Sequence, residues 1–406
     1  METDLTAGVP YEPPEPLQDA PVAVGDVLLG GWSVSEIHRG GQAWVLVVDD
    51  VEQGNRRAIK IPRSGALTGD AKLATLLGLE PHPHVVTTLD VAEVSGRRGI
   101  VLEYAPATLA DLLRRQLLTV SLRPSGGRRA GLAETAAPPW LIPRAEVLQE
   151  ICDGMAYLSK AGEFAHLDLK PSNVLIDGAG HAKIADFGLS QRVRTRDGRY
   201  SPAPGGTWAY AAPEVIQQKH CDSRADIFSF GVLLYQACTG KLPYPFPLAS
   251  TPNDQRAQLL DYYESPGPKD RTEELQYWGR LKSTQVPVAL PNEGISTAIS
   301  DCLRKDMADR PPSFRHLAEW LTGTLRIPQV RAETFPLPEI DRQRRELALS
   351  QALIRIGRVD EAVRRLNRLL STSLPPVLSA AVRHAAREAL TAAGRPSDAA
   401  TLEGWR

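Results

Sequence analysis

The chain has 406 residues, which is too many for one hydrophobic core and indicates two or three folded units. Its hydrophobic content of 42% is typical of a water-soluble globular protein, and it contains no apolar run long enough to cross a membrane. The formal net charge of −1 gives no indication of a nucleic-acid ligand. The four cysteines lack disulfide or metal-ligand spacing, which indicates reduced thiols. We therefore expect a cytoplasmic protein that binds neither nucleic acid nor membrane.

The first 24 residues are acidic and rich in proline. They hold five acids, five prolines and no lysine or arginine, and they lack the basic-then-apolar pattern of a secretory leader. A segment of this composition buries too little apolar surface to fold. We therefore predict a disordered, Pro-rich acidic tail over residues 1–24.

Residues 25–105 alternate between apolar and polar side chains as antiparallel strands do, with one helical segment at about 67–79. Gly40 and Gly41 lie in the turn between the first two strands, where glycine lets backbone amides approach phosphates closely. Lys60 lies 20 residues after Gly40, on the third strand. The predicted strands are 32–37, 44–48, 57–61, 86–94 and 99–104.

The stretch from 166 to 188 combines two short apolar strands with polar side chains at their ends. A turn rich in Asp and Gly joins the strands, so the hairpin brings Asn173 close to Asp186 although they lie 13 positions apart. An amide oxygen and a carboxylate at one place form a hard-oxygen site suited to Mg²⁺. Asp168 and Lys170 precede this site in a loop. A carboxylate that can accept a hydroxyl proton and a cation beside a metal are the parts that phosphoryl transfer needs.

Together with three later motifs, this stretch resembles the catalytic and metal loops of protein kinases. The later motifs are 205–214, which ends in Ala-Pro-Glu, 226–231 and the Arg-Pro pair at 310–311. The resemblance covers about 25–325 and implies a two-lobed α+β fold. ATP would bind between a small antiparallel β lobe over 25–105 and a larger helical lobe over 106–325.

The resemblance also implies the cofactors, the reaction and a role for each site residue. ATP and Mg²⁺ would be used to phosphorylate Ser or Thr hydroxyls of a protein substrate. Asp168 would accept the hydroxyl proton, and Lys170 would neutralise the transferring phosphoryl group. Asn173 and Asp186 would hold Mg²⁺. The residues expected to bind the nucleotide are Ile37, Gly40, Gly41, Val45, Ala58, Lys60, Leu102, Glu103 and Ala105. The backbone of Glu103 and Ala105 would bond the adenine edge.

Two polar residues are expected in structural roles. Asp226 lies in a segment, 225–239, that is apolar on all sides and predicts a buried helix, where a lone carboxylate would be costly. The resemblance implies that this carboxylate accepts hydrogen bonds from the catalytic-loop backbone. It also implies that Arg310 pairs with Glu214 of the Ala-Pro-Glu motif.

The rest of the chain predicts an insert, a linker and a helical tail. Residues 119–140 contain Pro, Gly and Arg without periodicity, which predicts an inserted surface loop. Prolines mark a linker over 326–341. Within the tail, 342–406, the segment 352–362 parallels 389–399 with a period of 37, which resembles tetratricopeptide (TPR) helix pairs. This TPR-like tail is expected either to dock on the kinase lobes or to bind a protein partner.

The sequence departs from the kinase pattern at three places. His38 and Ala43 stand where the family has glycine in the nucleotide-covering turn. No acid stands where the family has the helix glutamate that pairs with Lys60, so either Asp70 serves from a shifted register or the ion pair is absent. Leu167 replaces the arginine that meets a phosphorylated residue, so we predict activation by the tail, the insert or a partner instead.

Two alternatives therefore stand beside an active Ser/Thr kinase. One is a pseudokinase or scaffold that binds nucleotide weakly or not at all and acts through protein interaction. The other is a small-molecule phosphotransferase. The Ala-Pro-Glu segment disfavours it, because those enzymes lack a peptide-docking segment.

Overall fold

The computed structural model divides into two compact units, Met1–Leu67 with Val91–Val101 and Thr68–Asp90 with Leu102–Arg406. The structure describes residues 20–28, 31–40, 43–50, 54–63, 69–114, 146–161, 164–186, 191–192, 208–244, 282, 293–325, 337–395 and 398. The predicted insert, Gly41, the Phe-Gly part of the metal loop and most of the predicted acidic tail lie outside these residues.

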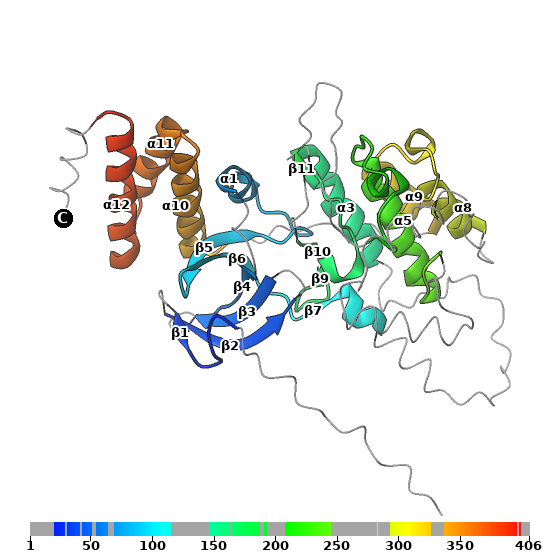
Figure 1. The fold of residues 1–406 in the computed structure, drawn as a ribbon, viewed down its shortest axis with the longest axis horizontal. Coiled ribbons are helices and arrows are strands. Elements are labelled where there is room, and N and C mark those ends of the chain that lie inside the picture. The colour runs from blue at the N-terminus through cyan, green and yellow to red at the C-terminus, as the bar shows by residue number, and fades with distance from the viewer. Residues whose placement is uncertain are drawn as a thin grey trace, which may run out of the picture. The chain divides into compact units, whose positions relative to one another are not determined.

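A six-stranded sheet carries most of the first unit, in the order β1-β2-β3-β4-β6-β5, and its first four strands pair antiparallel (Figure 1). Cross-strand apolar pairs build its core. Leu46 pairs with Ile59 and Trp44 with Ile61, and all four side chains are buried. The five predicted strands are confirmed as β2 (Trp32–Arg39), β3 (Ala43–Asp50), β4 (Arg56–Pro62), β5 (Thr88–Val94) and β6 (Arg97–Glu103), and a short strand β1 (Val27–Leu28) precedes them that was not predicted.

Helix α1 (Asp70–Gly78) follows β4 in the chain but belongs to the second unit. The predicted helix at about 67–79 is thus confirmed, and its first two turns bury Leu73, Leu76 and Leu77 at helical spacing. After α1 the chain runs through residues 79–87 in extended and turn conformations before it enters β5. This connecting segment is hydrogen-bonded to strand β10 of the metal-loop hairpin.

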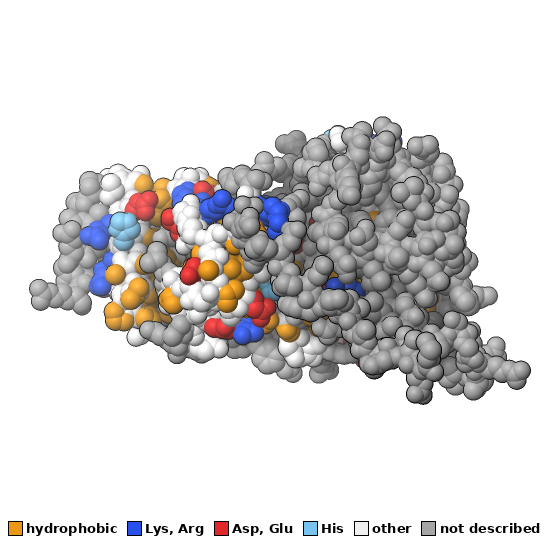
Figure 2. All heavy atoms as spheres, turned by 60° about the horizontal axis from the view of Figure 1, so that its bottom comes forward, with side chains coloured by type: hydrophobic (Ala, Val, Ile, Leu, Met, Phe, Trp, Pro, Cys, Tyr) orange, Lys and Arg blue, Asp and Glu red, His pale blue; other side chains and the backbone are white. Residues whose placement is uncertain are grey.

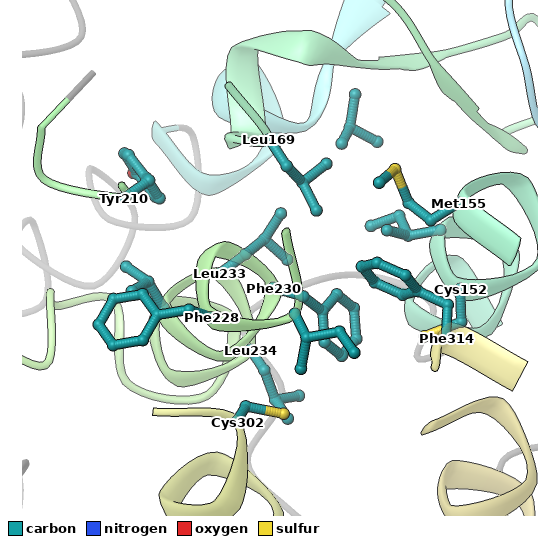
Figure 3. Packing of buried hydrophobic residues seen from close by; sticks show 14 of the residues in the cluster. Cys152, Met155, Leu169, Tyr210, Phe228, Phe230, Leu233, Leu234, Cys302 and Phe314 are labelled. Atoms are coloured by element: carbon teal, nitrogen blue, oxygen red, sulfur yellow. The ribbon is translucent and has the colours of Figure 1, made fainter. Parts of the chain in front are cut away.

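Four helices form the core of the second unit, with α3 packed on α9 and α5 packed on α8. Helix α5 is buried almost throughout because its sequence is apolar on every side, as predicted. Figure 3 shows Phe230 of α5 on the side of Met155 of α3 and Phe314 of α9, and Phe228 on the opposite side of the same helix. Burying each such side chain stabilises the fold by about 1.5–3 kcal/mol. The helices are α3 (Glu146–Ala161), α5 (Arg224–Thr239), α8 (Glu293–Cys302) and α9 (Phe314–Leu325).

Short elements place the loops around this core. A three-stranded sheet has the order β10-β9-β7, and a two-stranded sheet pairs β11 with β8. The elements are β7 (Ala107–Thr108), β8 (Phe164–Ala165), η1 (Pro171–Asn173), β9 (Val174–Ile176), β10 (Ala182–Ile184), β11 (Gln191–Arg192), α4 (Pro213–Ile216) and η2 (Met307–Asp309). The predicted apolar hairpin before the metal loop is therefore β9 and β10.

Three further helices follow the kinase-like part: α10 (Glu339–Arg355), α11 (Val359–Leu370) and α12 (Pro376–Ala392). Helix α10 begins within the predicted linker. The three helices lie side by side and share a hydrophobic cluster that includes Leu347, Leu366 and Val382 (Figure 1).

The 37-residue repeat of the tail has a structural counterpart. Gly357 and Gly394, which are 37 positions apart, both take positive φ directly after a helix. The Arg358 N–H donates to the Leu353 carbonyl at 2.9 Å, and Arg395 makes the equivalent bond to Leu390, also at 2.9 Å. Both α10 and α12 thus end in a Schellman motif, in which glycine adopts the left-handed conformation at no steric cost. The resemblance to TPR repeats stays a prediction.

Figure 2 shows acidic and basic side chains interspersed with apolar ones over the described part of one face of the molecule. Charge on this face is locally mixed, in keeping with the balanced composition. No helix within the described ranges is long and apolar enough to span a membrane. The four cysteines are buried free thiols, as predicted, and burial raises the pKa of Cys238 to about 12.

Candidate active site

A side chain of helix α5 holds the backbone of the catalytic loop. Both oxygens of Asp226 accept backbone hydrogen bonds at 2.7 Å, one from the His166 N–H and one from the Leu167 N–H. Leu167 has a φ of 63°, a left-handed conformation that costs a non-glycine residue on the order of 1–2 kcal/mol. Burial raises the pKa of Asp226 to about 6, opposed by His166 and by the two N–H bonds. The predicted role of Asp226 is confirmed.

His166 ties the catalytic loop to the metal loop. Its ring Nε2 lies 2.8 Å from the carbonyl oxygen of Ala185, the residue directly before Asp186. His166 is buried, so this contact is shielded from water. A buried polar contact therefore joins the two loops that carry the predicted catalytic and metal-binding residues.

Asp168, Lys170 and Asn173 form one cluster. Lys170 Nζ lies 2.8 Å from Asp168 Oδ2, with both side chains mostly shielded from solvent. The Asn173 amide Nδ2 donates to the Asp168 carbonyl at 2.8 Å and to its Oδ2 at 3.0 Å. Because the amide nitrogen is occupied in this way, the Asn173 Oδ1 points away from Asp168. That oxygen is the atom that Asn173 can offer to a metal ion.

The β9–β10 hairpin brings Asn173 and Asp186 together, as the sequence predicted. Val174 pairs with Ile184, and the Ala185 N–H donates to the Asn173 carbonyl at 2.9 Å. Asp186 follows at once with a φ of 62°, so a second left-handed non-glycine residue lies at this site. Residues held in such conformations cluster at functional sites.

These residues suit Mg²⁺. No group of three or more His, Cys, Asp or Glu that could hold a metal occurs in the described part of the chain. Mg²⁺ does not require such a group, because it keeps several waters and commonly takes one or two protein carboxylates together with substrate phosphates. The Asn173 amide oxygen and the Asp186 carboxylate, which are hard oxygen donors, fit that pattern.

Glu103 holds the expected adenine-binding segment in place, a role that the sequence gave no signal for. Its Oε1 accepts from the Thr87 N–H at 2.6 Å, and its Oε2 lies 3.1 Å from Lys183 Nζ on β10. The Glu103 N–H donates to the Thr87 carbonyl at 3.2 Å. The group that the Glu103 backbone can offer to adenine is therefore its carbonyl oxygen. Leu102 and Ala105 lie on either side of it, at the end of β6 and just beyond.

Of the remaining predicted nucleotide-binding residues, four lie on the sheet of the first unit, Gly40 lies in a turn, and Gly41 lies outside the described residues. Val45 pairs with Lys60 and Val47 pairs with Ala58, so Val45, Ala58 and Lys60 share one face of β3 and β4. Ile37 lies on β2, where it pairs with Leu46. In the turn that follows, the Gly40 N–H donates to the Ala43 carbonyl at 2.9 Å, and a Cβ on Gly40 would lie 3.0 Å from that oxygen.

Asp70, the acid that the sequence offered as a partner for Lys60, pairs with the C-terminal tail. Its Oδ1 lies 3.3 Å from Arg355 Nη1 of α10. Sequence reasoning missed this contact because the two residues are 285 positions apart.

Two cations secure the segment that ends in Ala-Pro-Glu. Arg310 is fully buried and forms two parallel bonds with Glu214, at 2.6 and 2.8 Å, which confirms the predicted pair. Lys282 is also buried, and its Nζ donates to the carbonyls of Trp208, Ala209 and Ala211 at 2.7, 2.9 and 2.7 Å. Lys282 was not predicted, because a lone lysine in a polar stretch usually lies on the surface.

Comparison with known proteins agrees with this geometry. The family model for the protein kinase domain matches residues 34–320, so the chain belongs to the protein kinase family, whose domain implies the use of ATP and Mg²⁺. The chain is 35% identical to CBL-interacting protein kinase 4 of Oryza sativa subsp. japonica, over 54% of this chain and 47% of that protein. It is 28% identical to the serine/threonine-protein kinase pkn2 of Myxococcus xanthus, over 70% of this chain and 31% of that protein. These matches span less than half the length of either relative.

Proposed function

We propose that this protein is an active serine/threonine kinase that transfers the γ-phosphate of ATP to protein hydroxyls. The observation that carries the proposal is the Asp168–Lys170–Asn173 cluster, which the β9–β10 hairpin sets beside Asp186. The names of several relatives, which describe serine/threonine-protein kinases, favour the same acceptor class.

The proposed mechanism assigns one task to each residue. The Asp168 carboxylate orients the acceptor hydroxyl and takes its proton as the oxygen attacks the γ-phosphorus, while the bond from that phosphorus to the β-phosphate oxygen breaks and ADP leaves. Lys170, which lies 2.8 Å from Asp168, stabilises the charge on the transferring phosphoryl group. Asn173 and Asp186 would hold Mg²⁺, which supplies neutralisation of the phosphate charge when bound. Asp226 and His166 keep the loop backbone rigid, so little reorganisation is needed at the moment of reaction.

The position of Leu167 bears on regulation. Family members with arginine here can bind a phosphorylated residue of the activation segment, and leucine cannot. Three hydroxyl residues between the metal loop and the Ala-Pro-Glu motif, Thr195, Tyr200 and Ser201, could still be phosphorylated, and they lie outside the described residues. We propose that activity is instead controlled by the C-terminal helices, the insert or a protein partner. The tail remains the candidate surface for such a partner.

A pseudokinase is the second candidate function. It is favoured by His38 and Ala43 in the nucleotide-covering turn and by the absence of an acid at the sequence position of the family's helix glutamate. A scaffold of this kind would keep the kinase fold and signal through its tail.

A transfer assay separates these candidates. The full chain is incubated with MgATP labelled at the γ-phosphate and with a peptide pool that contains Ser, Thr and Tyr acceptors. An active kinase labels Ser or Thr peptides, and Asp168→Asn lowers the rate by about 10²–10⁴-fold while the melting temperature is kept. Asp309→Asn, an exposed carboxylate on η2, serves as the control and should leave the rate unchanged. Absence of transfer by the wild type, together with no rise in melting temperature on adding MgATP, would point to the pseudokinase.

A further inference from the structure

We propose that Arg345 and Arg355 of α10 are positioning residues that hold helix α1 and, through the segment after it, the strand that leads into Asp186. The inference rests on the proposed kinase function, since it names how the C-terminal helices would act on that site. All the residues concerned lie in the second compact unit.

Helix α10 presents different faces to different neighbours. One face carries Ile340, Leu347 and Ile354, spaced seven residues apart, and packs with α11 and α12. Because one turn takes 3.6 residues, Ala348 and Ala352 fall on another face, together with the two arginines. Both alanines are buried, and α10 also packs against α1. Small side chains between the arginines let the two helix axes approach closely.

The two arginines contact opposite ends of α1. Arg355 Nη1 lies 3.3 Å from Asp70 Oδ1 in the first turn of α1. Arg345 donates to the carbonyl oxygen of Leu79, directly after the last turn. The later arginine meets the earlier residue, so the helices run antiparallel. The ten helical steps from Arg345 to Arg355 span about 15 Å, close to the about 13.5 Å of the nine steps from Asp70 to Leu79. Two contacts at this separation fix α1 against both sliding and rotation.

Arg345 also joins α1 to the catalytic lobe helix α3. Its guanidinium lies near Glu80 and Tyr157, and burial lowers the pKa of Arg345, opposed by Glu80. The Tyr157 hydroxyl donates to the Glu80 carbonyl at 2.6 Å, and its ring stacks on His82 with centroids 4.5 Å apart. The arginine of the tail, the turn after α1 and helix α3 therefore form one connected cluster.

The segment after α1 is bonded to the metal-loop hairpin. The Val86 N–H donates to the Ile184 carbonyl at 2.8 Å, and the Ile184 N–H donates to the His84 carbonyl at 2.9 Å. Ile184 ends β10 and lies two residues before Asp186. A shift of α1 and of its following turn is thus transmitted through backbone hydrogen bonds to the residue that would hold Mg²⁺. The expected kinetic effect is a change in the Mg²⁺ requirement.

Hydrogen exchange of the full chain tests whether the two arginines hold α1, and it does not require a kinase assay. Arg345→Ala should raise exchange in peptides covering 70–86 by about tenfold, since it removes a charge-assisted bond from a buried site. Arg355→Ala should raise it by about threefold, because a partly exposed pair contributes less. Arg342→Ala is the matched control: it lies on the same helix, is exposed and pairs with Glu339 of α10 itself.

Kinetic measurements test whether this effect reaches Asp186. They determine kcat, the KM for ATP and the Mg²⁺ concentration that gives half-maximal rate. Arg345→Ala and Arg355→Ala should raise the Mg²⁺ requirement about threefold or more, as their effect on α1 passes to Asp186. Arg355→Lys should retain most of the wild-type behaviour. The double variant Asp70→Arg with Arg355→Asp should restore it relative to either single change, because the pair is rebuilt with its charges exchanged.

The proposal is overturned if exchange over 70–86 is unchanged in both alanine variants. It is equally overturned if exchange in α11 and α12 rises as much as exchange over 70–86, because the tail would then be loosened as a whole. A change in the Mg²⁺ requirement of Arg342→Ala as large as that of Arg345→Ala or Arg355→Ala would also overturn it. If the wild type transfers no phosphate at all, the proposed function fails, whereas the exchange measurement still decides whether the arginines hold α1.

Discussion

Asp226 holds Leu167 in a left-handed backbone conformation through a 2.7 Å bond from the Leu167 N–H to the Asp226 Oδ1. The carboxylate is buried, and its other oxygen accepts the neighbouring N–H of His166. One side chain of α5 therefore sets the path of the loop that carries Asp168. The unfavourable backbone conformation of Leu167 is offset by these two bonds. A carboxylate can make both, because each of its oxygens accepts from one N–H donor.

Asp226→Ala is expected to destabilise the fold by about 2–4 kcal/mol, because it leaves two buried N–H groups without an acceptor. Activity should fall even in the folded fraction, since Leu167 is no longer held. Asp226→Asn should be intermediate in stability, because its amide can accept only one of the two bonds. Chemical denaturation and kinase rates measure the two effects. Unchanged stability in the alanine variant would contradict this role.

Arg310→Ala is expected to cost about 3–5 kcal/mol, because it leaves the Glu214 carboxylate buried without its partner. Arg310→Lys should rescue little, since an ammonium cannot form the two parallel bonds of a guanidinium. Arg304→Ala is a suitable control, because its pair with Asp301 is largely exposed and should contribute about 0–1 kcal/mol. Equal losses for the two alanine variants, measured by urea unfolding, would refute the account.

Lys282→Met is expected to loosen the segment from Trp208 to Ala211, because methionine keeps the length of the side chain but donates no bond to the three carbonyls. A loss of at least about 2 kcal/mol is expected from those buried acceptors. If this segment docks the protein substrate, the KM for peptide should rise while the KM for ATP stays constant. A parallel rise of both values would argue against a specific effect on peptide docking.

Gly154→Ala should be destabilising, since a Cβ there would lie 2.3 Å from the His84 carbonyl oxygen on the segment that bonds β10. Gly323→Ala, in α9, provides the control because nothing lies within 4 Å of its Cβ position. That change should stabilise the protein by about 0.4–1 kcal/mol, since alanine restricts the unfolded chain. Thermal melts of the two variants should therefore shift in opposite directions, and shifts of the same sign would disprove the close approach.

The stability of the second unit should fall as pH drops below neutral, in part because of His82. Burial, helped by His84 and Lys183, lowers the pKa of His82 from 6.5 to about 4. At a pH between these two pKa values, His82 is protonated in the unfolded state and neutral in the folded state. Lowering the pH therefore favours unfolding. The contribution of His82 is complete above pH 6.5 and is lost as the pH falls toward 4.

His82→Phe keeps a ring to stack on Tyr157 but cannot take up a proton. It also loses the ring nitrogen that accepts from the His84 N–H, so its melting temperature at pH 7 should be somewhat lower. The decisive quantity is the change in melting temperature between pH 7 and pH 5, which should be smaller in His82→Phe than in the wild type. An identical change in both proteins would rule out His82 as a source.

The sequence predicted the elements whose signals are local. Strand alternation located β2 to β6, and the apolar run of α5 predicted its burial. The hairpin between Asn173 and Asp186 followed from a turn flanked by two apolar strands. The Arg310–Glu214 pair was predicted only because a family resemblance links motifs 96 positions apart.

The residues that the sequence missed act over long distances and carry no local pattern. Glu103 was predicted only for its backbone, and its side chain, like Lys183 and Lys282, looks like an ordinary surface group in the sequence. In the fold the Glu103 carboxylate accepts from the Thr87 N–H and lies against Lys183, and Lys282 donates to backbone carbonyls. The contact of Arg355 with Asp70 depends on how α10 packs on α1, which periodicity alone cannot predict. The bonds between Glu103 and Thr87 likewise depend on how a neighbouring segment packs beside β6.

The most direct test of the central claim is the rate of γ-phosphate transfer to Ser and Thr peptides as a function of Mg²⁺, for the wild type and for Asp186→Asn. We expect a saturating Mg²⁺ response in the wild type. In the variant, the rate should be lower by at least about 10²-fold at any Mg²⁺ concentration, with the fold intact. A variant that transfers phosphate at the wild-type rate and with the same Mg²⁺ response would contradict the proposed site.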